Sequence, residues 1–77
     1  MCKLLPEGTD LDSVTTNGMF YVRTGSHIPQ SYFYFVTMKS TGSADAIQFG
    51  FSLLDYKIHY RKYNNAKWES WISINFS

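Results

Sequence analysis

Hydrophobic residues recur at every second position along much of the chain, and this period of two predicts β-strands. No stretch keeps the i, i+3, i+4, i+7 spacing of apolar residues over the roughly 11 residues that argue for a long helix. The alternating segments predict five strands, over residues 19–23, 32–38, 46–53, 57–63 and 68–74. The expected fold is therefore all-β, a small antiparallel sheet or sandwich of about five strands.

The patterns within these strands differ. Residues 32–38 are aromatic or β-branched almost throughout, which predicts a central strand buried on both faces. In the next strand Ile47, Phe49 and Phe51 alternate with polar or small residues, which predicts one apolar face. The last strand separates its two tryptophans, because Trp68 falls on one face and Trp71 on the other.

Two local signals complete the expected fold. Residues 10–14 predict one short N-terminal helical turn, for which Thr9 or Asp10 is the N-cap. Asn64 and Asn65 predict a tight hairpin turn between the last two strands, because Asn tolerates the left-handed conformation. Residues 1–8 are expected to be a poorly packed lead-in to a single domain that spans residues 1–77.

The chain is small, and its composition suggests how it gains stability. It has 77 residues, of which 44% are hydrophobic, including six Tyr, six Phe and two Trp. A domain of this size buries only about 60% of the surface that its unfolded chain exposes. Cys2 is the only cysteine, and neither His27 nor His59 has a further ligand at metal-binding spacing, so we expect no disulfide, metal or cofactor. Oligomerisation is then the expected stabiliser.

Positive charge is concentrated in the C-terminal hairpin. Residues 1–56 contain three Lys or Arg and five Asp or Glu, whereas residues 57–77 contain four and one. Four candidate ligand-binding residues stand in this hairpin: His59, Arg61, Tyr63 and Trp71. Flat aromatic faces stack on sugar rings, and Arg and Tyr donate hydrogen bonds to hydroxyl or carboxylate groups. The alternative is that these residues only pack across strands, and Trp68 is expected to lie in the core beside Ile72 and Ile74.

Other functions find little support in the sequence. The carboxylates and histidines form no acid-base pair, and no nucleophile elbow or phosphate loop is present, so we expect no enzyme. A net charge of +1 argues against nucleic acid as a partner. No apolar run approaches the roughly 20 residues of a membrane helix, and the N-terminus does not look like a signal peptide. We therefore expect cytoplasmic synthesis without membrane insertion.

Two blocks of sequence resemble a known module. The first, residues 8–22, reads GTDLDSVTTNGMFYV, and the second, residues 58–71, reads IHYRKYNNAKWESW. Both are similar to the opening and closing patterns of the knob domain of R-type pyocin and bacteriophage tail fibres. They depart from it at Asn17, where the family usually has Pro, and at Ala66, where Gly is expected. Together they cover most of the chain, in the order found in the family.

The resemblance implies a function for the chain. It indicates a non-enzymatic module of a phage or prophage tail fibre, located in the virion, which acts in host recognition. Such a module binds bacterial surface glycan or serves as a structural segment of a homotrimer, and in this chain both roles would use the face of His59, Arg61, Tyr63 and Trp71. The alternative is a stand-alone protein-binding module with an intracellular or regulatory role. The ligand and the host are not specified by the sequence.

Overall fold

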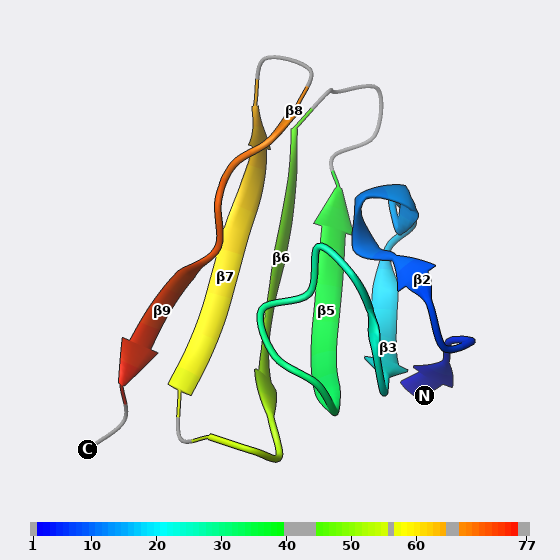
Figure 1. Ribbon diagram of the computed structural model, residues 1–77. Helices are drawn as coiled ribbons and strands as arrows, with labels where there is room; N and C mark the ends of the chain where they lie inside the picture. Colours follow the sequence, from blue (N-terminus) through cyan, green and yellow to red (C-terminus); the bar gives the residue numbers. More distant parts are fainter. Residues whose placement is uncertain (1, 40–44, 56, 65–66, 76–77) are drawn as a thin grey trace.

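The computed structural model describes residues 2–39, 45–55, 57–64 and 67–75, and these residues form an all-β fold. A mixed seven-stranded sheet makes up most of it (Figure 1). Its strands are β1 (Cys2–Leu4), β3 (Gly18–Val22), β5 (Phe33–Lys39), β6 (Ala46–Ser52), β7 (Lys57–Asn64), β8 (Lys67–Trp68) and β9 (Ile72–Asn75). A two-stranded sheet of β2 (Thr9–Asp10) and β4 (Gly25–Ser26) and a 3₁₀ turn, η1 (Leu11–Ser13), complete the structure.

The main sheet runs in the order β1-β3-β5-β6-β7, and β8 and β9 both pair with the far edge of β7. All neighbours are antiparallel except β1 and β3, which are parallel. The central position predicted for residues 32–38 is confirmed by β5. β1, β2 and β4 are absent from the predicted strands, because two or three residues are too few to show a period. The predicted strand 68–74 is two strands, β8 and β9, because residues 69–71 interrupt the pairing with β7.

The predicted helical turn is a single 3₁₀ turn at η1. Asp10 is its N-cap, because its side chain accepts a 3.0 Å hydrogen bond from the backbone N–H of Asp12. The predicted tight turn includes Asn65, which lies outside the described residues.

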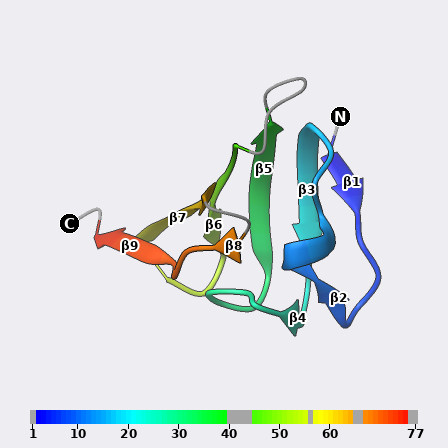
Figure 2. The ribbon, with the colours of Figure 1, turned by 90° about the horizontal axis from the view of Figure 1, so that it is seen from above.

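One face of the sheet, which we call the covered face, packs against η1 and the chain around β4. Figure 2 shows η1, β2 and β4 on one side of the main sheet. The core lies here, and it consists of six buried apolar side chains: Leu11, Val14, Phe20, Val22, Phe33 and Phe35. Phe33 stacks on Phe35 with ring centroids 5.4 Å apart. Leu5, Ile28 and Trp71 pack around this core and are partly buried.

The opposite side, which we call the open face, is also apolar. The strand register places its side chains in rows that cross the sheet. One row consists of Leu4, Tyr21, Tyr34, Phe51, Ile58 and Ile74. The next row consists of Cys2, Met19, Val36, Phe49, Tyr60 and Ile72. Met38, Ile47 and Lys62 form a shorter third row.

The large apolar residues of β6 therefore point away from the core, whereas those of an alternating strand usually point towards it. Phe49 and Phe51 point to the open face, whereas Gln48, Gly50 and Ser52 are buried on the covered face. The prediction that β5 is buried on both faces is also wrong, since Phe33, Phe35 and Thr37 are buried but Tyr34 and Met38 are exposed. Close packing explains the glycine at position 50, because a Cβ atom there would overlap the carbonyl oxygen of Tyr34.

Candidate functional site

The four predicted ligand-binding residues lie on the covered side of the sheet. His59 and Arg61 are only 4% and 3% exposed, so the prediction that they form a free face is wrong. Trp71 is partly buried and packs edge-on against Phe33, with ring centroids 5.4 Å apart. Tyr63 is partly exposed at the end of β7. His59 and Arg61 are therefore internal, and the role of all four residues in binding a ligand stays a prediction.

Arg61 is the centre of this region. Its guanidinium carbon lies 4.3 Å from the ring centroid of Trp68 and 4.6 Å from that of Trp71, so both tryptophans make cation–π contacts with it. Its Nη1 lies 2.8 Å from Oδ1 of Asp12. Burial lowers the pKa of Arg61, and Asp12 opposes that effect. The two tryptophans thus converge on one cation instead of pointing apart.

The indole N–H groups tie the last strands to the segments that cover the sheet. Trp68 donates to the carbonyl of Asp12 at 3.2 Å, and Trp71 donates to the carbonyl of His27 at 2.7 Å. Ile72 and Ile74, which were expected to share a face with Trp68, are about half exposed on the open face. The interruption at residues 69–71 explains the error, because a broken strand does not keep a two-residue period across the break.

A file of buried polar residues crosses the covered face. Thr37, Gln48 and Arg61 are direct cross-strand neighbours on β5, β6 and β7. Gln48 accepts a 2.9 Å hydrogen bond from Nε of Arg61, and its amide donates to the carbonyls of Leu11 and Val14 at 3.0 and 3.1 Å. This polar file therefore fastens η1 to the sheet, since the Gln48 side chain binds the carbonyls of the first residue of the turn and of its C-cap.

His59 belongs to a second group of polar contacts near the other end of β7. Its Nδ1 is 2.7 Å from Oγ of Ser73, and its Nε2 is 3.2 Å from Oδ2 of Asp55. The ring also meets Phe33 edge-on. These contacts use both ring nitrogens, so His59 is a satisfied internal histidine.

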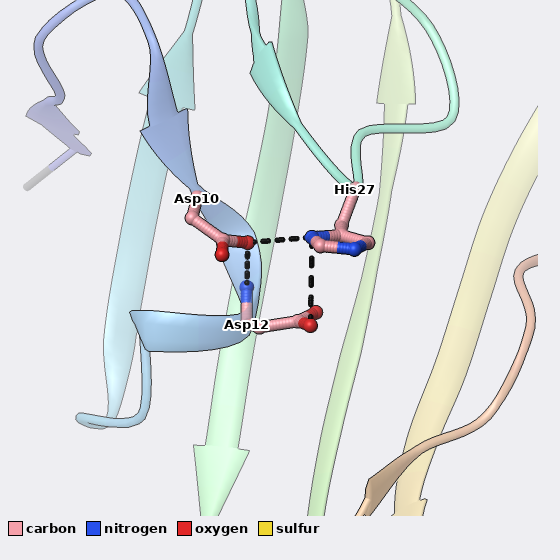
Figure 3. A group of neighbouring side chains, drawn as sticks. All are labelled: Asp10, Asp12 and His27. Atoms are coloured by element: carbon pink, nitrogen blue, oxygen red, sulfur yellow. Dashed lines mark hydrogen bonds and ion pairs between the residues drawn. The ribbon is translucent and has the colours of Figure 1, made fainter.

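Figure 3 shows a cluster that was not predicted from the sequence: Asp10, Asp12 and His27. Nδ1 of His27 lies 2.8 Å from Oδ1 of Asp10 and 3.5 Å from Oδ2 of Asp12. The backbone of His27 has φ of 58°, in the left-handed region that non-glycine residues seldom adopt. The carboxylates and the indole of Trp71 hold it there. His27 lies 15 and 17 positions after the two aspartates in sequence, so spacing gave no signal.

The cluster is electrostatically coupled. The hydrogen bond to Asp10 raises the pKa of His27, and the charge of Asp12 adds to this effect. The same bond from His27 lowers the pKa of Asp10, together with the N-cap hydrogen bond. One ligand atom from each residue lies within 4.8 Å of the others, so the view that His27 has no neighbouring ligand is corrected. Ion pairs, including that of Arg61 with Asp12, account for the arrangement.

One partly exposed hollow borders the predicted site. It has a volume of about 320 Å³ and lies between Asp12, Lys39, Tyr63 and Trp68, with Thr15 and Ala46 at its sides. The rings of Tyr63 and Trp68 meet edge-on with centroids 5.4 Å apart. Of the four predicted residues, only Tyr63 borders it.

The open face differs from the covered face because its side chains have few partners within the chain. Eight of its large apolar residues are 37–73% exposed: Leu4, Met19, Tyr34, Met38, Phe49, Phe51, Ile72 and Ile74. An apolar hollow of about 580 Å³ lies in it above β5 and β6. The alternation of Ile47, Phe49 and Phe51 predicted one apolar face of this strand, but alternation alone does not show whether that face is covered.

Comparisons with family models, curated proteins and solved structures find no match to this chain. The resemblance to the knob domain therefore stays a prediction. In the part of the chain that the structure describes, no helix has the length and apolar character needed to cross a membrane.

Proposed function

We propose that the chain is a non-enzymatic structural module that works in contact with other protein chains, as a segment of a phage or prophage tail fibre or a related virion adhesion structure. One observation carries the proposal: an entire face of the sheet is apolar and lacks a covering layer among the described residues. Contiguous exposed apolar patches of this kind mark interaction surfaces. The resemblance to tail-fibre knobs supplies the class of assembly and the expected threefold symmetry.

The structural role is favoured over glycan binding because of how the covered face is used. Nε and Nη1 of Arg61 contact Gln48 and Asp12, and the two ring nitrogens of His59 contact Ser73 and Asp55. A saccharide approaching from that side would first meet Tyr63 and the partly exposed edge of Trp68. The predicted glycan site is thus reduced to the rim of a small hollow, whereas the apolar face is extensive.

The mass of the protein in solution tests the proposal. Light scattering during size-exclusion chromatography is expected to show a stable trimer. A chain that stays monomeric at every accessible concentration would contradict the fibre role and favour the alternative, a stand-alone protein-binding module.

A glycan array tests the other role of the same module. If a bacterial surface glycan binds, Tyr63→Ala should abolish binding, because Tyr63 is the one predicted ligand residue that borders the hollow. Lys57→Ala is the matched control, since Lys57 is exposed at the opposite end of β7. Binding that survives Tyr63→Ala would remove this hollow as the glycan site.

A further inference from the structure

The open face has the composition of a protein interior. Its two long rows contain aromatic and aliphatic side chains and the thiol of Cys2, and among the described residues of its three rows Lys62, in the short third row, is the one charged side chain. Aromatic side chains also contact each other across strands. The rings of Tyr21 and Tyr34 are 4.5 Å apart, and those of Tyr34 and Phe51 are 6.2 Å apart. The face is therefore ordered by its own contacts, and it is not a scatter of single exposed residues.

The exposed area is large enough for a stable interface. With roughly 200 Å² for a whole large apolar side chain, the exposed fractions of its eight most exposed residues leave roughly 800 Å² in contact with water. This is above the roughly 300–600 Å² of the largest apolar patch on a typical monomer. It equals the roughly 800 Å² that each partner contributes to an interface of standard size.

The distribution of charged residues around the open face indicates which kind of partner fits it. A membrane surface is recognised by basic residues that surround an apolar face, but the basic residues beside Met38 and Ile47 of this face are Lys39 and Lys62 at one end, together with the acidic Asp45. A protein partner must instead present a surface that is equally free of charge. A second copy of this chain presents such a surface, and two sheets pack face to face when side chains of both interdigitate across about 10 Å.

The shape of the face also suits a second copy. The hollow above β5 and β6 is lined by apolar side chains of Met19, Tyr34, Val36, Phe49 and Phe51. The backbone of Gly50 also lines it. Met19 and Phe51, which line the hollow, are 52% and 51% exposed. Protruding side chains next to a recess are what a self-complementary contact requires, because each copy offers both parts.

We propose that copies of this chain associate through their open faces, so that the apolar rows of two sheets enclose a common core. This inference rests on the proposed function because both require self-association. The choice of the open face as the contact surface rests on separate observations. Two copies facing each other cover the whole face, and in a threefold ring each face is shared between two neighbours. Both arrangements bury Phe51 and Met19, so the same substitutions test the surface whatever the number of copies.

The experiment compares the wild-type chain with Phe51→Lys and Met19→Lys by sedimentation velocity over a concentration series. A lysine on this face would have to lose its water in the interface without a partner. We therefore expect association at least about 30-fold weaker, the size of effect that follows loss of a hot-spot residue. Leu54→Lys is the matched control, because Leu54 is 57% exposed but lies in the turn after β6. It should associate like the wild type.

The thiol of Cys2 gives a second readout. It is exposed in the single chain and lines the hollow, so association should slow its reaction with a thiol reagent. Phe51→Lys should restore the fast rate. If a lysine variant fails to fold by circular dichroism, Met19→Gln replaces it, and the thiol rate is measured on that variant.

The outcomes separate the two proposals. A wild-type oligomer that persists in both lysine variants, with an unprotected thiol, overturns the open face as the contact but leaves the fibre role intact. A wild-type chain that is monomeric overturns both proposals. An assembly that the lysine variants dissociate, but whose mass is not that of a trimer, supports the open face and contradicts the threefold fibre role.

Discussion

At the scale of single residues, the covered face shows how polar groups can form part of a small core. Arg61 is almost fully buried, but two indole rings, the side-chain oxygen of Gln48 and the carboxylate of Asp12 surround it. Arg is suited to this position because its planar guanidinium stacks and donates hydrogen bonds at once. A lysine at position 61 would keep the charge and lose the stacking geometry.

The cluster of Asp10, Asp12 and His27 leads to a prediction on pH. The pKa of His27 is raised above its ordinary value of 6.5, so protonated His27 stabilises the fold below pH 6.5, and this contribution is lost as the pH rises through the raised pKa. The pKa of Asp10 is lowered below 3.8, so its contribution is present above pH 3.8 and is lost as the pH falls through the lowered pKa. Both contributions are complete between about pH 4 and 6.5.

Thermal unfolding followed by circular dichroism checks this expectation. The melting temperature of the wild type should fall between pH 6.5 and 8.5 relative to that of His27→Gln. Asp10→Asn is the matched variant, because Asn keeps the N-cap acceptor but not the charge. In the Asp10→Asn variant the fall in melting temperature between pH 6.5 and 8.5 should be smaller. An unchanged difference between wild type and His27→Gln across this range would contradict the coupling. The effect is expected to be small, since the side chain of His27 is 57% exposed.

At the scale of elements, contacts with the sheet hold η1 in position. A turn of three residues has little stability of its own, and Gln48 on β6 supplies the hydrogen bonds that fasten it. Trp68 and Trp71 fasten the opposite side through the carbonyls of Asp12 and His27. The covering layer is thus held from the strands below it and from the segment after β7.

Gln48→Leu tests this attachment. The substitution is expected to lower the free energy of unfolding by about 2 to 4 kcal/mol, because the carbonyl of Val14 and Nε of Arg61 would lose buried partners. Thr37→Val is the control, since Thr37 makes only the longest of the three contacts of the Gln48 amide, at 3.4 Å. It should cost less than about 1 kcal/mol. Urea denaturation measures both, and equal costs for the two variants would refute the special role of Gln48.

At the scale of the whole molecule, the single chain is a layer of sheet with cover on one side. Small domains bury too little surface to be very stable alone, and eight large apolar side chains on the open face of this sheet are 37–73% exposed. Stability should therefore depend on association. The melting temperature of the wild type is expected to rise with protein concentration, because binding of folded copies to one another draws the equilibrium away from the unfolded state. Calorimetry at several concentrations checks this, and Phe51→Lys should show no such dependence.

Strand positions could be predicted from the sequence because alternation is a local property. The predicted segments 46–53 and 57–63 differ from β6 and β7 by one residue at one end. Which face is covered could not be predicted, because the cover comes from residues 9–14 and 25–28, far away in sequence. Arg and His are residue types that usually lie at the surface. Only the contacts of Arg61 and His59 with Gln48, Asp12 and Asp55 show that these two residues are internal.

The polar file of Thr37, Gln48 and Arg61 also restricts how the chain can misfold. Since the large apolar side chains of β6 and β7 lie on the open face whereas the core lies on the covered face, hydrophobicity alone would tolerate a slip of one residue between these strands. Such a slip of β7 would turn Arg61 to the open face opposite Phe49 and Tyr60 to the covered face, so the side-chain oxygen of Gln48 would lose the hydrogen bond from Arg61. A chain that is apolar on two sides thus uses its buried polar residues to reject the inverted sheet, which would otherwise compete during folding.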